Sequence, residues 1–170
     1  VELYSEEEIN LSEYTFEDAS SSDVLTLVNA TDSRYYLIVE AGFNASGLNA
    51  SVYSAGATLG NNLNNNGDVA LLRDQNGDVA DVVSYTNSMG GDGNGMALCR
   101  NVTLMECAPT PGSDNVFPAS NQTAGTNRSN ITLPPALDYH DVTINELLPN
   151  PKGLDTEEMP DGECVELYNN

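Results

Sequence analysis

The stretch GDVALLRDQNGDVADVVSYT, residues 67–86, decides the fold class of this chain. Two apolar runs, 69–72 and 79–85, lie on either side of the dipeptide Asn76-Gly77. Asn-Gly is favoured in tight turns, because both residues tolerate a positive φ angle. We therefore predict a β-hairpin with its turn at Asn76-Gly77.

Outside this hairpin the chain also consists of short apolar runs bounded by Gly, Asn, Ser, Asp and Pro, and none has the period of a long amphipathic helix. In the segment NLSEYTFEDAS we expect Leu11, Tyr14 and Phe16 to reach the core. Further strands are expected within residues 1–5, 23–29, 35–42, 51–59, 95–102, 140–148 and 164–170. This pattern predicts an all-β sandwich.

Residues 116–140 are rich in Ser, Thr, Asn and Pro, a composition typical of an extended, glycosylated linker. Alternation returns in HDVTINELLPNPKG, residues 140–153. A strand with a period of two would place Val142, Ile144, Glu146 and Leu148 on one face and Thr143, Asn145 and Leu147 on the other.

The charge of the chain is strongly acidic, with five Lys and Arg against 26 Asp and Glu and a formal net charge of −21. Nucleic acids and anionic membranes are poor partners for such a surface. No apolar run reaches the roughly 18 residues that a membrane helix needs. No basic-then-apolar leader is present, so we expect any secretion signal to have been removed or to lie upstream. The charge suits a secreted protein, a salt-rich habitat or divalent counter-ions, or is simply a solvated acidic face.

The sequence contains eight Asn-x-Ser/Thr acceptor motifs for N-linked sugars, several times what chance would scatter, although an Asn- and Ser-rich chain produces some freely. They begin at Asn10, Asn29, Asn44, Asn49, Asn101, Asn121, Asn127 and Asn130. These motifs indicate a secreted, extracellular glycoprotein.

Three cysteines fit an oxidising compartment, although three free thiols in a cytosolic protein are the alternative. Cys99 and Cys107 are eight positions apart and are expected to form a disulfide across a hairpin or turn. Cys164 is left over, which suggests pairing with another chain or another repeat.

The word VELY occurs at residues 1–4 and again at 165–168, so any repeat has a period of 164 residues. Four matching residues are a small coincidence in a strand-forming sequence. Alternatively, the chain is one window of a longer array.

Six segments together resemble the lamin tail domain, an immunoglobulin-like β-sandwich of nuclear lamins and of many secreted bacterial and archaeal proteins. The segments are VTINELLPNP, GECVELYNN, NLSEYTFED, YYLIVEAG, NNNGDVALLRDQNGDVADVVSY and CAPTPGSDN. Cys164 stands where the family usually has Trp. The resemblance covers residues 1–115 and 141–170, and it places the family's first strand in 141–170.

This order implies that residues 1–115 form a sandwich without its first strand, and that residues 141–170 begin the next sandwich or donate a strand to a neighbour. A single odd domain or a fragment is the alternative. If the strand is donated, the residues expected to bury against the neighbour are Val142, Ile144, Leu147 and Leu148. Cys164 could then add a covalent link between units.

Catalytic chemistry has little support in the sequence. His140 could pair with Asp141 as a base, but no nucleophile motif accompanies it. The loop GGDGNG, residues 90–95, lacks the Lys and the strand-to-helix setting of a phosphate-binding loop. We therefore expect no enzyme activity, and a solvent-facing His140.

Calcium is the best small-ligand hypothesis, although no cofactor is required. Asp74, Asn76 and Asp78 supply hard oxygen ligands at alternating positions, but they also form the predicted hairpin turn. A second acidic loop, which could equally be a solvated surface, contains Asp155, Glu157, Glu158, Asp161 and Glu163.

The sequence therefore favours a structural subunit or repeat of a glycosylated filament, sheath or surface-layer-like assembly on an archaeal or bacterial cell surface. Its partners would be copies of itself, joined head to tail through residues 141–170, without nucleic acid or membrane insertion. The alternative is an accessory module of a larger secreted protein that binds a glycan, calcium or a protein. A free-standing hydrolase is a third, weaker hypothesis.

Overall fold

A computed structural model describes residues 2–4, 9–90, 93–101, 103–117, 142–149 and 164–168, with the backbone alone for 2–4 and 164–168. This part of the chain forms strands and two short 3-10 turns, η1 (Leu11–Glu13) and η2 (Asn87–Met89), and contains no α-helix. The strands are β1 (Glu2–Tyr4), β2 (Thr15–Glu17), β3 (Ser22–Val24), β4 (Thr26–Asn29), β5 (Tyr35–Glu40), β6 (Ser51–Gly56), β7 (Gly67–Arg73), β8 (Val79–Thr86), β9 (Ala97–Arg100), β10 (Leu104–Cys107), β11 (Thr143–Leu148) and β12 (Cys164–Tyr168). The predicted all-β class is confirmed.

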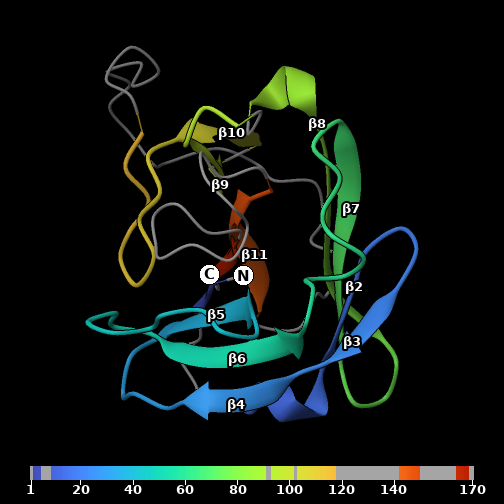
Figure 1. The fold of residues 1–170 in the computed structure, drawn as a ribbon, viewed down its shortest axis with the longest axis vertical. Coiled ribbons are helices and arrows are strands. Elements are labelled where there is room, and N and C mark those ends of the chain that lie inside the picture. Colours follow the sequence, from blue (N-terminus) through green and yellow to red (C-terminus); the bar gives the residue numbers. More distant parts are fainter. Residues whose placement is uncertain are drawn as a thin grey trace, which may run out of the picture.

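The strands form two sheets (Figure 1). The larger sheet has the order β10-β9-β11-β12-β5-β6-β4, and β1 pairs in addition with β5. The smaller sheet has the order β3-β2-β7-β8. In Figure 1, β7 and β8 stand along one side, β4, β5 and β6 lie across the bottom, and β11 runs near the centre. Two layers with an apolar interface between them are the arrangement of a β-sandwich.

The hairpin that the sequence predicts is present as β7 and β8, which pair along their whole length from Gly67↔Thr86 to Arg73↔Val79. Its turn is closed by the Asp74 amide, which donates to the Asp78 carbonyl at 3.0 Å. Gly77 has a φ angle of 84°. This is the left-handed conformation that glycine adopts without a Cβ penalty, so the Asn-Gly interpretation holds.

The expected strand over 23–29 is two strands in different sheets. β3 pairs with β2 in the smaller sheet, whereas β4 pairs with β6 in the larger one. Leu25, between them, is 1% exposed and belongs to the main core. The chain therefore passes from one layer to the other at Leu25, which alternation alone does not reveal.

The main core lies between the two sheets. Leu11 and Phe16 are fully buried, as expected, and Tyr14 packs half-buried against them. The cluster draws on β2, β5, β6, β7, β8, β9 and β11, and it includes Leu25, Tyr36, Ile38, Tyr53, Leu59, Leu63, Leu72, Tyr85, Leu98, Val142, Ile144 and Leu147. Three of its members come from 142–147, so the C-terminal segment is part of the core of this chain.

Strands β11 and β12 complete the larger sheet of the same chain. β11 pairs with β9 on one side and β12 on the other, and β12 pairs with β5. The sequence led us to expect residues 141–170 in the next sandwich or in a neighbour. In this structure the described strands of that segment pair within the larger sheet of the chain itself.

The predicted alternation along β11 is wrong after Ile144. Ile144 lies opposite Leu167 and Glu146 opposite the adjacent Glu166, so Asn145 is an extra residue, a β-bulge. A bulge reverses the facing of every later side chain. Leu147 therefore joins Val142 and Ile144 in the main core. Leu148 instead packs in a second cluster, with Ala97, Cys99, Cys107 and Phe117.

Candidate functional site

The candidate site is the place where the C-terminal strands sit, between β9 on one side and β5 on the other. We call this position the strand seat, and β11 with β12 the C-terminal strand pair. β11 contacts β9 through the pairs Glu146↔Cys99 and Leu147↔Leu98. An empty seat would leave the inner edge of β9 unpaired, and unpaired edges readily take up another strand.

Asp81 of β8 ties β11 to the smaller sheet. Its side-chain Oδ2 accepts the Ile144 amide at 2.6 Å and the Arg100 Nη2 at 2.7 Å. Asp81 is 5% exposed. Burial raises the pKa of Asp81, while the Arg100 charge and the amides of Ile144 and Val82 oppose that rise. A buried carboxylate thus binds the backbone of β11 at one residue.

Asn115 holds the bulge. Its Nδ2 donates to the Asn145 Oδ1 at 2.7 Å, and the Asn145 Nδ2 donates back to the Asn115 Oδ1 at 3.1 Å. The Asn115 Nδ2 also lies 3.3 Å from the Arg100 carbonyl oxygen. This reciprocal amide pair fixes the side chain of Asn145, the extra residue that has no partner in the β11–β12 pairing.

Glu146 is fully buried and is bound by Thr110. Its Oε2 accepts the Thr110 amide at 3.1 Å and the Thr110 hydroxyl at 3.0 Å. Burial raises the pKa of Glu146 to about 7, although the two Thr110 bonds favour the charged form.

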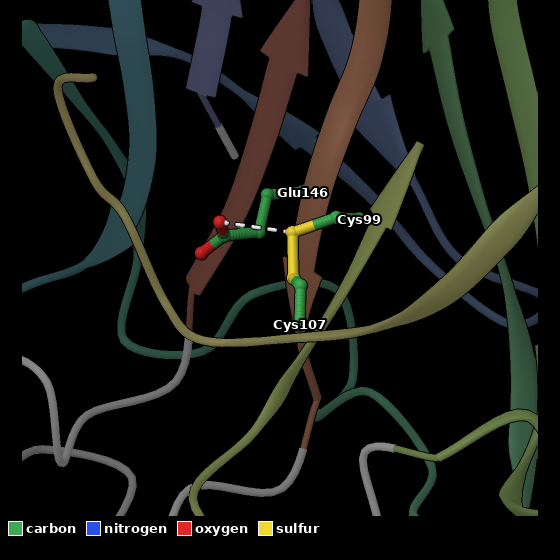
Figure 2. Close-up of side chains that lie close together, drawn as sticks. All are labelled: Cys99, Cys107 and Glu146. Atoms are coloured by element: carbon green, nitrogen blue, oxygen red, sulfur yellow. Dashed lines mark hydrogen bonds between the residues drawn. A yellow bond between two sulfur atoms is a disulfide. The ribbon is translucent and has the colours of Figure 1, made fainter. Parts of the chain in front are cut away.

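Cys99 and Cys107 form the disulfide that their spacing suggests, with a Cα–Cα distance of 5.8 Å. Figure 2 shows the Glu146 carboxyl group beside it, with Oε2 at 3.3 Å from the Cys99 Sγ. A disulfide sulfur carries no proton, so Cys99 donates no hydrogen bond to Glu146 at this contact.

The two cysteines and Glu146 are the three-ligand group that the described residues offer to a metal ion, with ligand atoms within 4.8 Å of one another. Metal ligation by cysteine requires thiolates. Because both sulfurs are bound in the disulfide, this group anchors β11 to the β9–β10 hairpin and does not present a metal site.

The two copies of the word VELY pair with the same strand in the same register. In β1, Glu2 lies opposite Leu37 and Tyr4 opposite Tyr35. In β12, Glu166 also lies opposite Leu37, and Val165 lies opposite Ile38. Both pairings are antiparallel. β5 has β6 along its other edge, so β1 and β12 share one edge of β5.

The predicted glycosylation sites that the structure describes are all exposed: Asn10, Asn29, Asn44, Asn49 and Asn101. Asn121, Asn127 and Asn130 lie outside the described residues. Asn29 is the last residue of β4, which is an edge strand of the larger sheet. The two residues before it, Leu27 and Val28, are 46% and 59% exposed. A sugar at Asn29 would cover an apolar sheet edge.

The calcium candidates at the hairpin are used by the turn. The Asp74 Oδ1 accepts the amides of Asn76 and Asp78, both at 2.9 Å, and its Oδ2 accepts the Asn76 Nδ2 at 3.2 Å. The Asp74 side chain thus holds the turn through the Asn76 side chain and the backbone amides of Asn76 and Asp78. The second acidic loop, with Asp155, Glu157, Glu158, Asp161 and Glu163, lies outside the described residues.

The other predicted residues have different outcomes. The proposed contact residues Val142, Ile144, Leu147 and Leu148 are buried in the chain's own sandwich. Cys164 begins β12 opposite Leu148 and Val39, and its side chain is outside the description. His140 and Asp141 also lie outside it, as do residues 91–92 of the GGDGNG loop.

Sequence reasoning missed Asp81, Thr110 and Asn115, the three residues that bind β11. Asp81 carried the clearest signal, because a charged residue within the apolar run 79–85 needs a partner when that run is buried. Glu146 gave a similar signal inside TINELL. Thr110 and Asn115 stand in an irregular segment, where no local pattern identifies a partner.

No family model, curated protein or solved structure matches this chain. Within the described residues, no helix has the length and apolar character needed to cross a membrane.

Proposed function

We propose that this chain is a structural subunit or repeat of a glycosylated extracellular filament, sheath or surface-layer-like assembly, joined head to tail through residues 141–170. The observation that carries the proposal is the shared register of the two VELY copies on β5. Two segments 164 positions apart thus pair with the same edge of β5, each with a Glu opposite Leu37.

A repeating assembly accounts for this duplication. In a continuous array, the second VELY begins the next sandwich and pairs with the β5 of that unit. In a polymer of separate subunits, the C-terminal strand pair of one copy enters the strand seat of the next. In each version a VELY segment pairs with a β5 strand through the contacts that β12 makes with β5 in this structure.

An extracellular setting is supported by three features. The Cys99–Cys107 disulfide is typical of an oxidising compartment. The five described acceptor asparagines are exposed and so accessible to a glycosylating enzyme. The resemblance to secreted lamin-tail-like domains of bacteria and archaea agrees with both, and favours an assembly at a bacterial or archaeal cell surface.

The net charge of −21 sets a condition on assembly. Like-charged units repel each other, and salt reduces that repulsion within a Debye length of about 8–10 Å at roughly 0.10–0.15 M ionic strength. We therefore expect assembly to strengthen at high ionic strength or with divalent cations, which fits a salt-rich habitat.

Electron microscopy and intact mass test the proposal together. The chain would be secreted from a glycosylating host and imaged in low and high salt, and its mass measured before and after sugar removal. We expect filaments with a repeat of one sandwich and several sugars on each chain. Unglycosylated single units of 18.1 kDa at every salt concentration would contradict the proposal and favour an accessory binding module.

A further inference from the structure

We propose that the strand seat accepts the C-terminal strand pair of a second copy of this chain, and that Asp81, Thr110 and Asn115 select its register. This inference rests on the proposed assembly and names the contact that joins its units. The seat lies between β9 and β5, and its occupants are β11 (Thr143–Leu148) and β12 (Cys164–Tyr168).

The three selecting residues all lie outside the segment that they bind. Asp81 accepts the Ile144 amide, Asn115 pairs with Asn145, and Thr110 binds Glu146. A strand from any copy would therefore meet the same three groups in the same order.

These contacts distinguish the correct register from its neighbours. A slip by one residue would bring Leu147 or Asn145 to Thr110 in place of Glu146 and remove the amide pair at Asn115. It would also leave buried polar groups without partners, and such a strand should be outcompeted by one in the correct register. Apolar packing alone would tolerate the slip better, because Leu147 and Leu148 are adjacent and identical.

The connection to the strand pair is long enough for exchange. Twenty-four residues, 118–141, separate Phe117 from Val142. An extended chain of this length spans roughly 80 Å, whereas a folded chain of this size has a radius of gyration of about 15 Å. The segment can therefore reach the seat of an adjacent copy as well as its own.

Mass action decides which seat is filled. The strand pair of a chain is tethered to its own sandwich. It therefore competes with the strand pairs of other copies for its own seat at an effective concentration in the millimolar range. Exchange between copies makes the same contacts, so it should become visible when chains fold together at high concentration. In a packed assembly the local concentration of neighbouring chains is always high.

The native Cys164 provides a direct test, because it lies opposite Val39 in the β12–β5 pairing. Directly opposed positions have Cβ atoms about 4.5–5.5 Å apart, close to the range of a disulfide. The variant Val39→Cys should therefore link β12 to β5 within one chain. This variant is the positive control for geometry.

The test itself mixes two full-length chains. One carries Val39→Cys with Cys164→Ser, and the other is unmodified. They are unfolded, refolded together over a range of concentrations and oxidised, and the links are mapped by mass spectrometry of peptides. We expect a disulfide from the cysteine introduced by Val39→Cys to Cys164 of the other chain, in a yield that rises with concentration. Its absence, with the positive control intact, would overturn the inference.

A pair of substitutions tests the selecting residues. The receiving chain carries Ile38→Cys with Cys164→Ser, because a slip by one residue would bring Cys164 of the other chain opposite residue 38. Adding Thr110→Val should raise the yield of that out-of-register link about tenfold, because it removes a donor to buried Glu146 in the correct register. Thr26→Val, at an exposed strand position, is the matched control and should leave the yield unchanged. If Thr110→Val does not fold, Asn115→Ala replaces it. An unchanged yield in a folded variant would refute the selecting role.

The two proposals fail differently. Filaments that form without this disulfide between chains would leave the assembly standing and overturn the strand exchange. The disulfide between chains without filaments would support the exchange and contradict the filament.

Discussion

Glu2 and Glu166 lie opposite the same residue, Leu37 of β5, although 164 positions separate them in the sequence. Both copies of the word VELY therefore pair antiparallel with one strand in one register. A coincidence of letters would not require a common partner. Both copies therefore pair with β5, the strand that forms one side of the strand seat.

Stability should depend on pH through Glu146. Its pKa is raised from 4.5 to about 7 by burial, so between these values the native state holds a proton that the unfolded chain releases. The stabilisation from this group is complete below pH 4.5 and is lost as pH rises through 7. The shift corresponds to about 3 kcal/mol, and urea unfolding at about pH 4.5 and pH 8 would measure it.

Glu146→Gln serves as the control for this effect, because an amide does not titrate. The variant should lose most of the difference in unfolding free energy between the two pH values. If the variant keeps the pH dependence of the unmodified chain, the titrating group is elsewhere and the assignment to Glu146 is wrong.

Asp81→Ala should destabilise the chain strongly. The substitution removes the acceptor of the Ile144 amide and of Arg100 inside the sandwich, which should cost about 3 kcal/mol in the free energy of unfolding. Asp78→Ala removes an exposed carboxylate and should change stability by no more than about 0.5 kcal/mol. Equal effects in urea unfolding would argue against the buried network.

Removing the disulfide should weaken the side of the strand seat formed by β9. Replacing both Cys99 and Cys107 by Ala releases a short closed loop, which should lower the free energy of unfolding by about 2–3 kcal/mol. Thermal unfolding under oxidising conditions checks this. A variant as stable as the unmodified chain would show that the bond contributes nothing to the sandwich.

Gly77→Ala tests the hairpin turn. Open space surrounds the position of an added Cβ, so any cost comes from the φ angle of 84°. A loss of about 1 kcal/mol in the free energy of unfolding is expected. Gln75→Ala, at an exposed position of the same turn, should have no measurable effect. Similar values for the two variants would contradict the assigned turn conformation.

Local patterns predicted much of this fold. The β7–β8 hairpin, the buried Leu11 and Phe16, and the Cys99–Cys107 bond follow from turn residues, alternation and spacing that act over a few positions. These features can be predicted from a single sequence because their physical causes lie within a few neighbouring residues.

Features that depend on distant partners were not predictable in the same way. The strand at 23–29 divides at Leu25 because two separate sheets bind its halves. The facing of Leu147 depends on the bulge at Asn145, which is held by Asn115. The seat filled by β11 is likewise created by β9 and β5, far away in sequence.

The most direct test of the account compares the particle masses of two variants over a range of concentrations in high salt. Oxidised Val39→Cys locks β12 onto its own β5, whereas Val39→Cys with Cys164→Ser has the same altered core and no lock. The account predicts multiples of 18.1 kDa that grow with concentration for the unlocked variant, and a single 18.1 kDa species for the locked one. Equal assembly of both variants, or single units for both, would contradict it.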